Sequence, residues 1–361
     1  MSKNKKKNKK KMSPQTLENI KTGFGTIISN DAVIKSARNM KGPLDLIPIG
    51  LGLVAVVLSV LPTLVSRLNV QGSSAVFAAP VGLYDQGVAN FVDTLVYDPA
   101  NDSPREISLT IENGTYKLST EDREKLLYGE QWYTVSRFSM DSMVPVFEVF
   151  FNYEGSNVTD NEFLTRLNEY KNPFSGEARG DDSVKSPLAS YLYFGMNTIA
   201  FRKIVPGKTT LGLNGRYDKL NGVNFTALAK QLREEKKLDP TNAKYVEEVT
   251  KFFTDVMNRS YEPDKMVQTW QYTGIFAGVN FGLVILFGAI IFIMTRGKKN
   301  PYRIFTFWET QKMAYWASFT PALLSMAIGF FMTQYAFIFF MFTFGMRMMW
   351  MSMRSLRPVA Q

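Results

Sequence analysis

Two long apolar runs constrain this chain more than any other feature of its sequence. Residues 44–66 (LDLIPIGLGLVAVVLSVLPTLVS) contain one charged residue, Asp45, at their edge, and residues 272–294 (YTGIFAGVNFGLVILFGAIIFIM) contain none. A transmembrane α-helix needs about 20 apolar residues to cross roughly 30 Å of hydrocarbon. Both runs are long enough, so we expect two transmembrane helices rather than two buried helices of a water-soluble domain.

Two further apolar stretches lie near the C-terminus, at 313–332 and 335–353, with Thr333 and Gln334 between them. Each is long enough to cross a bilayer if the two-residue turn between them is tight. The sequence therefore predicts a membrane protein with about four transmembrane α-helices. The alternative for residues 304–353 is one span and a re-entrant segment.

The polar segment between the first two spans, residues 67–271, predicts an extracytoplasmic α+β domain. In EISLTIENGTYKLST (106–120), two β-type runs flank Asn113-Gly114, which indicates a hairpin. A polar loop is expected at 171–187. Further strands are expected at 131–138, 144–151 and 191–205, and helices at 161–170, from Asn224 and from Asp239.

The last of these helices carries an apolar stripe at helical spacing, which we interpret as domain core rather than a partner-binding face. Pro263 is expected to end this helix before the second span. The stripe consists of Tyr245, Val249, Phe252, Phe253, Val256 and Met257.

Charge is distributed unevenly, and this predicts the orientation. Residues 1–43 hold eleven basic and two acidic residues, whereas residues 67–271 hold 23 basic and 28 acidic residues. The loop after the second span and the C-terminus are basic too, and basic flanks face the cytoplasm. The expected order is a basic cytoplasmic tail (1–43), span 1 (44–66), the outer domain (67–271), span 2 (272–294), a basic cytoplasmic loop (295–312), two further spans (313–353) and a cytoplasmic C-terminus (354–361).

The first span is expected to be an uncleaved signal anchor in the plasma membrane. A small-residue site at Val76-Phe77-Ala78 suggests cleavage, but the apolar run before it is longer than that of a signal peptide. The segment before the span repeats apolar residues at helical spacing. It either lies on the inner leaflet or serves as a short tether; its residues are Leu17, Ile20, Phe24, Ile27 and Ile28.

The lysine run at the N-terminus marks the cytoplasmic side and is expected to face anionic lipid, at about 1 kcal/mol per basic residue near the surface. Nucleic acid is not an expected partner, because no aromatic residues or recognition fold accompany the run. The lipid-facing residues are Lys5, Lys6, Lys7, Lys9, Lys10 and Lys11.

The composition excludes several chemistries. The chain has no cysteine and no histidine, so thiol nucleophiles, disulfides, zinc sites built on these residues and Ser-His-Asp triads are impossible. Gly207-Lys208-Thr209 is not a phosphate-binding loop, because Arg202 stands where its first glycine is required. We expect no cofactor, no metal and no enzymatic activity.

Glycine spacing in the second span favours helix packing. Gly274, Gly278 and Gly282 form two overlapping G-x-x-x-G units, which allow close approach of another helix from this chain or from another subunit. Asn280 is a polar group in the same span that needs a partner. These four residues predict assembly rather than chemistry.

Arg347 is a charge inside the last apolar stretch. Its side chain either snorkels to the inner surface beside Arg354 or pairs with Glu309 or Asp45. Without a chain of buried acids across the membrane, a proton-coupled carrier is poorly supported.

Several segments together resemble a known family. They are the early span, the ENGTYKL hairpin, TIAFRKI and GRYDKLNGVNFTALAKQL, and the entry RIFTFWETQKMAYWASFTPALLSMAIGFF. Over most of residues 44–357 the chain resembles a family of Gram-positive multi-pass membrane proteins, some named maltodextrin-utilisation proteins of the MalA type. The resemblance implies association with maltodextrin uptake and supplies no catalytic residues. This chain differs by its lysine-rich start and its larger outer domain.

Three classes of function follow. The first is a non-enzymatic accessory subunit of a carbohydrate ABC uptake system, bound to permease subunits or to itself. The second is an extracytoplasmic sensor or ligand-binding protein that signals through a partner. The third is a membrane-anchored enzyme limited to carboxylate or serine chemistry. The chain lacks an EAA-type coupling loop, so we do not interpret it as the permease.

Overall fold

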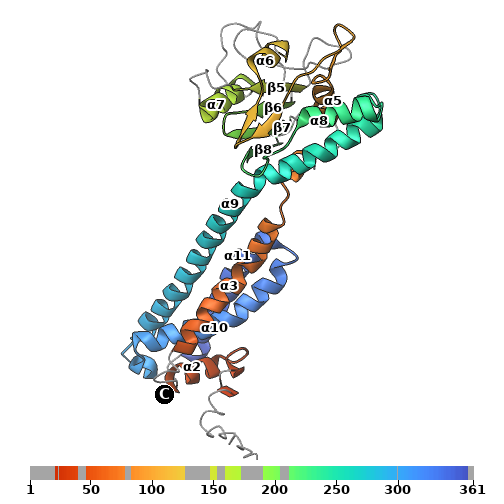
Figure 1. Ribbon diagram of the computed structural model, residues 1–361. Coiled ribbons are helices and arrows are strands. Elements are labelled where there is room, and N and C mark those ends of the chain that lie inside the picture. The colour runs from red at the N-terminus through yellow and green to blue at the C-terminus, as the bar shows by residue number, and fades with distance from the viewer. Residues whose placement is uncertain are drawn as a thin grey trace, which may run out of the picture. The chain divides into compact units, whose positions relative to one another are not determined.

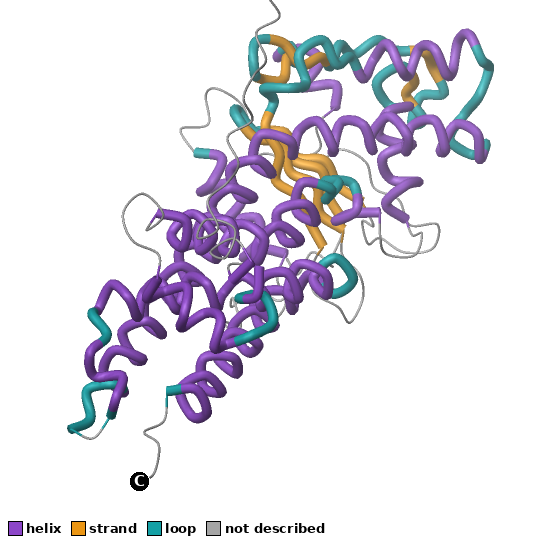
Figure 2. Tube along the Cα trace, turned by 90° about the horizontal axis from the view of Figure 1, so that it is seen from below, coloured by secondary structure: helices purple, strands orange, loops and turns teal. Residues whose placement is uncertain are grey.

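The computed structural model describes residues 21–22, 24–39, 46–77, 83–126, 147–152, 159–171, 190–203, 211–298 and 300–356. The chain divides into two compact units. The helical unit comprises Met1–Asn69 and Gln268–Gln361, and the α/β unit comprises Val70–Val267. Figure 1 labels the elements, and Figure 2 shows them by type, with the described strands confined to the α/β unit.

Long helices build the helical unit. They are α3 (Leu46–Leu68), the end of α9 (Ala243–Met294), α10 (Phe307–Gly329) and α11 (Ala336–Trp350). The shorter elements are α2 (Asn30–Asn39), the 3₁₀ helices η4 (Pro301–Ile304) and η5 (Thr333–Tyr335), and the π-helical turn η6 (Met351–Ser355).

Three described helical segments are long and apolar enough to cross a membrane: Leu46–Leu68, Ala243–Met294 and Thr333–Ser355. With the mixed α/β region between the first span and the long helix, they confirm the coarse architecture of a candidate multi-pass membrane protein. The sequence predicted four spans, and α10 is the one not among these three. Polar side chains such as Gln311, Ser318 and Ser325 reduce its hydropathy, and all three are buried. They meet protein rather than lipid.

Helix α10 begins at a capping box. The Thr306 hydroxyl accepts a hydrogen bond from the Glu309 amide, and the Glu309 carboxylate accepts one from the Thr306 amide at 2.7 Å. The helix then packs closely on α3. A Cβ on Gly52 would lie 2.6 Å from the Tyr315 ring, and one on Gly329 would lie 2.8 Å from Pro62. The contact earlier in α3 (Gly52) is also the one earlier in α10 (Tyr315), and the later contact joins Pro62 to Gly329, so α3 and α10 run parallel.

Helix α2 packs against the end of this bundle. Val33 and Ala37 are buried in the same apolar cluster as Phe305, Met351 and Leu356. The sequence left open whether the segment before the first span lies on the leaflet or serves as a tether. Helix α2 follows that segment, and its apolar face is buried on protein. Of the earlier apolar positions, Phe24 and Ile28 are exposed, and Leu17 and Ile20 lie outside the described residues.

A four-stranded sheet forms the centre of the α/β unit, in the order β5-β6-β7-β8. Strands β5 and β6 pair in parallel, whereas the β6–β7 and β7–β8 pairs are antiparallel. Every residue of β5 and β6 is buried, which indicates that both faces are covered. The strands are β5 (Phe147–Phe151), β6 (Ser190–Phe194), β7 (Thr198–Lys203) and β8 (Leu211–Arg216).

Helices cover the sheet. One face forms the main core with α5 (Leu83–Asp93), α8 (Phe225–Lys230) and the beginning of α9. The other face packs on α7 (Asp160–Lys171) through Phe163 and Leu164. The remaining elements of this unit are α4 (Ser74–Phe77), β1 (Tyr97–Asp98), β2 (Ser103–Pro104), β3 (Thr110–Glu112), β4 (Thr115–Lys117), α6 (Thr120–Leu126) and the π-helical turn η3 (Gln231–Glu235).

Several local predictions are confirmed. Strands β3 and β4 form the expected hairpin, with φ of 54° at Asn113 and 76° at Gly114. Helix α7 covers the helix expected at 161–170. Asn224 caps α8 by accepting a 2.8 Å hydrogen bond from the Ala227 amide. The predicted apolar stripe is core: five of its six residues are fully buried, and Phe252 packs against them.

Other local predictions are wrong or fall outside the described residues. The strand expected at 191–205 is two strands, β6 and β7, with a turn at Gly195–Asn197. Strand 144–151 is seen from Phe147 onward. The strand expected at 131–138 and most of the loop expected at 171–187 lie outside the described residues.

Helix α9 does not end at Pro263. It continues for 52 residues from Ala243 to Met294. Proline removes one hydrogen bond and crowds the preceding turn, at about 3 kcal/mol. Long helical segments on both sides outweigh this cost, because the earlier one is buried in the α/β core and the later one is an apolar span.

Candidate functional site

The glycine stripe of α9 contacts nothing else in the described structure. No heavy atom lies within 4 Å of an ideal Cβ at Gly274, Gly278 or Gly282. Neighbouring Ile275 and Val279 are also exposed, at 61% and 44%. The stripe therefore leaves room for close approach of another helix backbone.

Asn280 faces the other way. It is fully buried, and its side-chain amide donates a 2.7 Å hydrogen bond to the Ser59 hydroxyl in α3. Successive helical residues are about 100° apart, so Gly278 and Gly282 each point about 200° from Asn280. The predicted packing role of Asn280 is therefore confirmed within the chain, where it joins α9 to α3, but on the opposite face of α9 from the glycines.

The sequence missed the glycines that pack inside the chain. In α9, an ideal Cβ on Gly288 would lie 2.7 Å from the side chain of Gln311, which donates to the Ile285 carbonyl at 3.1 Å. Gly52 and Gly329 play the same part between α3 and α10. Sequence spacing can show that glycines share a helix face, but it cannot show which residue of another helix packs against them.

Arg347 binds carbonyl oxygens instead of a carboxylate. Its guanidinium donates to the carbonyls of Ala317, at 3.0 Å, and of Thr26, and to the Asn30 side chain at 3.3 Å. The expected pairing with Glu309 is wrong, because Glu309 caps α10. Asp45 lies outside the described residues. Snorkelling is not seen either, since this side chain joins α11 to α10 and to the segment before α2.

The three basic segments meet at one end of the helical unit. Asn300 donates to the Leu356 carbonyl at 3.4 Å, and Arg296 donates to the Phe305 carbonyl at 2.8 Å. Val33 of α2 shares their apolar cluster. The lysine run from Lys5 to Lys11 lies outside the described residues.

An apolar groove of about 460 Å³ lies between α9 and α11. Phe287 and Ile291 line one side, and Met348 and Met349 line the other. Methionine-rich apolar surfaces adapt to flexible ligands such as lipid chains.

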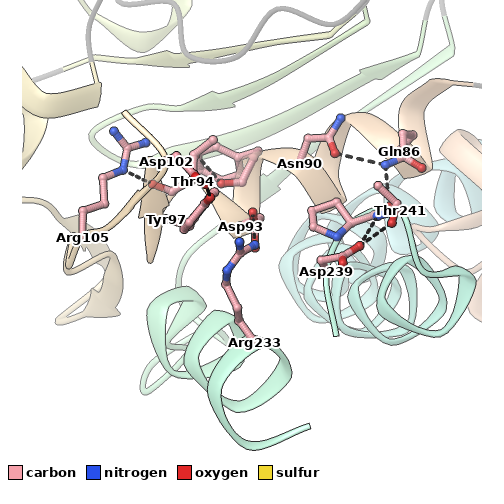
Figure 3. Close-up of polar contacts among 12 residues, drawn as sticks. Gln86, Asn90, Asp93, Thr94, Tyr97, Asp102, Arg105, Arg233, Asp239 and Thr241 are labelled. Carbon is pink, nitrogen blue, oxygen red and sulfur yellow. Dashed lines mark hydrogen bonds and ion pairs between the residues drawn. The ribbon is translucent and has the colours of Figure 1, made fainter. Parts of the chain in front are cut away.

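In the α/β unit, a buried ion pair joins α5 to η3 (Figure 3). One guanidinium nitrogen of Arg233 lies 2.6 and 2.7 Å from the two carboxylate oxygens of Asp93. The same guanidinium stacks on Tyr97, 3.6 Å from the ring centre. Burial raises the pKa of Asp93, although the hydrogen bond and charge of Arg233 oppose this rise.

Neighbouring polar contacts extend this link to α9. Gln86 donates to the Asn90 side chain at 3.0 Å and to the Pro240 carbonyl at 2.9 Å (Figure 3). Thr241 donates its amide to Asp239 at 2.8 Å just before α9 begins. The network fastens α5 to the two helical segments that follow the sheet.

A second carboxylate, Asp160, anchors the turn between β6 and β7. It accepts hydrogen bonds from the amides of Met196 and Asn197, at 2.8 and 2.7 Å, and from the Tyr193 hydroxyl at 2.8 Å. Burial by itself would raise the pKa of Asp160, but these donors outweigh it and lower the pKa overall. With so many donors, the group acts as a structural anchor.

A third acidic group lies at the start of α5. Burial raises the pKa of Asp85, and the charge of Lys203 opposes this. One carboxylate oxygen of Asp85 is buried and has no hydrogen-bond partner among the described residues. No group of three Cys, His, Asp or Glu side chains that could hold a metal occurs among the described residues.

Comparison with protein-family models, curated proteins and solved structures finds no match to this chain.

Proposed function

We propose that this chain is a non-enzymatic integral membrane accessory protein that assembles with other membrane subunits. The observation that carries the proposal is the glycine stripe of α9, which is exposed and without contacts while Gly52, Gly288 and Gly329 are in close contact. Lipid tails offer no hydrophobic driving force between helices, so small residues that allow close packing favour association.

The proposed orientation places the basic end of the helical unit in the cytoplasm and the α/β unit outside. It rests on the meeting of α2, the loop after α9 and the C-terminal segment at one end, with their basic residues. Helix α10 is proposed as the fourth crossing, because it runs parallel to α3 and a short turn, η5, joins it to α11. Its burial between neighbours explains how a less apolar helix can cross.

The proposed partners are the permease subunits of a carbohydrate ABC uptake system of the maltodextrin type. This part of the proposal rests on the sequence resemblance alone. The occupant of the glycine stripe would be an apolar permease helix.

Purification from the native host in mild detergent, followed by mass spectrometry, tests the proposal. We expect permease subunits in stoichiometric amounts with the unaltered chain. Gly278→Leu should reduce their recovery several-fold. Gly50→Leu is the matched control, because Gly50 also lies in a span and has no atom within 4 Å of its ideal Cβ. It should leave recovery unchanged.

Circular dichroism and gel filtration should show that both variants fold. Recovery of the chain alone, or only with copies of itself, would contradict the permease partnership. Equal loss of permease recovery with Gly278→Leu and Gly50→Leu would contradict the proposal that the glycine stripe binds the permease.

A second candidate is a sensor that signals through a partner. It is favoured by the continuity of α9, which contributes Tyr245 and Val249 to the α/β core and Val284 and Ile291 to the helical core. A helix that is continuous through two units can carry a ligand-induced signal from one to the other. Calorimetric titration of maltodextrins into the detergent-solubilised chain distinguishes the candidates, because only the sensor binds them without a permease.

A further inference from the structure

A cavity of about 470 Å³ lies at the basic end of the helical unit, between α2, η4 and η6. Lys35 and Arg38 of α2 line one side. Tyr302 and Phe305 contribute aromatic rings, and Ser355 contributes a hydroxyl. The cavity thus combines two cations and hydroxyl donors with an apolar wall.

The two cations are arranged to act together. Lys35 and Arg38 are three residues apart on one helix, so their side chains lie on the same face. Asp31 is the one acidic residue among the described residues of the lining. A bidentate guanidinium beside an ammonium group is well suited to phosphate oxygens.

The walls of the cavity are fixed by contacts outside it. Helix α2 is held by the buried residues Val33 and Ala37, and the segment before it by hydrogen bonds from Arg347 and Thr320. On the opposite wall the rings of Tyr302 and Phe305 stack, with centres 5.7 Å apart and planes within 3°. Contacts among described residues therefore hold both walls of the site in place.

Exposed aromatic and apolar side chains surround this end of the bundle. Ile304 and Trp308 are each 64% exposed, and Trp350 is 54% exposed. Exposed tryptophan at the end of a span is typical of the level of lipid headgroups. The cavity therefore lies where phospholipid phosphates are concentrated.

We propose that this cavity binds the phosphate-bearing headgroup of an anionic membrane phospholipid, with Lys35 and Arg38 on the phosphate and the stacked rings against the glycerol region. The site is separate from the lysine run, because its described lining residues lie on or next to α2, η4 and η6. Through this site, an anionic phospholipid would be a specific partner of this chain. The proposal does not rest on the accessory function above.

Native mass spectrometry of the full chain in detergent tests this site. The probes are phosphatidylglycerol and, as a zwitterionic comparison, phosphatidylcholine. About 0.3 M salt weakens non-specific attraction between the lipid and surface charges more than binding at a partly enclosed site. We expect one tightly bound phosphatidylglycerol and at least about tenfold weaker binding of phosphatidylcholine.

The Lys35→Gln/Arg38→Gln variant should weaken binding of that phosphatidylglycerol by about tenfold or more, since each basic residue near a lipid surface adds about 1 kcal/mol, nearly fivefold in affinity. Lys298→Gln/Arg303→Gln is the matched control: it removes the same charge at the same end, but neither residue lines the cavity. It should change affinity by less than about threefold. The exchanged pair Lys35→Arg/Arg38→Lys should retain binding.

Equal losses in both glutamine variants, or equal affinity for the two lipids, would overturn the proposal. Displacement of the lipid by millimolar inorganic phosphate would also overturn it, because the pocket would then bind phosphate from solution. Failure here leaves co-purification of permease subunits untouched, so the two proposals fail separately.

Discussion

The side-chain amide of Asn280 donates a 2.7 Å hydrogen bond to the hydroxyl of Ser59, although the two residues are 221 positions apart. Both are buried in apolar spans, on α9 and α3. The bond fixes the rotation of α9 about its own axis. With Asn280 turned inward, Gly278 and Gly282 are turned outward, so an internal polar contact determines which face of α9 stays open.

A double-mutant cycle measures this contact. We expect Asn280→Ala and Ser59→Ala to be non-additive, with a coupling free energy of about 0.6 kcal/mol and at most about 1.7 kcal/mol, the average and the maximum for hydrogen bonds between membrane helices. Unfolding in mixed micelles provides the free energies. Simple additivity would show that the bond does not contribute to stability.

Two glycines of α3 provide a second test. An ideal Cβ on Gly52 would lie 2.6 Å from the Tyr315 ring, which cannot move easily beside α3, whereas Gly50 has nothing within 4 Å. Gly52→Ala should therefore lower the free energy of unfolding by about 1 to 3 kcal/mol. Gly50→Ala should raise it by about 0.5 to 1 kcal/mol through helix propensity. Thermal unfolding in detergent compares them, and equal effects would contradict the close α3–α10 packing.

Structural features that depend on residues close together in the sequence could be predicted. Apolar length identified three candidate spans, turn chemistry at Asn113-Gly114 identified the hairpin, and the Asn224 cap identified the start of α8. Helical periodicity identified the stripe around Val249 as core.

Features that depend on partners far apart could not be predicted. Spacing showed that Gly278 and Gly282 share a face, but not that this face would be open while Gly52 is in contact. The site around Lys35 and Arg38 depends on residues more than 260 positions later, so no local signal reveals it. Pro263 was misjudged because its local cost is outweighed by the helical segments on both sides.

The Asp93–Arg233 pair should be important for the stability of the α/β unit. The side chains are 9% and 26% exposed. Removing one partner of a buried pair costs 3 to 5 kcal/mol, and the partial exposure of Arg233 reduces our expectation for Asp93→Ala to about 2 to 3 kcal/mol. Limited proteolysis and urea unfolding of the full chain measure the loss.

The matched control for that experiment is the exposed pair of Glu121 and Lys125 in α6, 3.0 Å apart, with side chains 82% and 44% exposed. Glu121→Ala should cost less than about 0.5 kcal/mol. If Asp93→Ala lowers the free energy of unfolding no more than Glu121→Ala does, the ion pair and the stacking of Arg233 on Tyr97 do not hold α5 to η3.

Asp160 predicts how the α/β unit responds to acid. Its pKa in the folded chain lies below the unfolded value because of the amide and hydroxyl donors around it. A carboxyl group with a depressed folded pKa stabilises the fold above its unfolded pKa, about 3.9, and this contribution is lost as the pH falls through the folded pKa. Asp160→Asn should therefore destabilise the chain at pH 7 and make its stability less sensitive to acid below about pH 4. Urea midpoints measured from pH 7 to pH 3 compare the two proteins. Parallel pH profiles would show that the turn between β6 and β7 does not depend on the charge of Asp160.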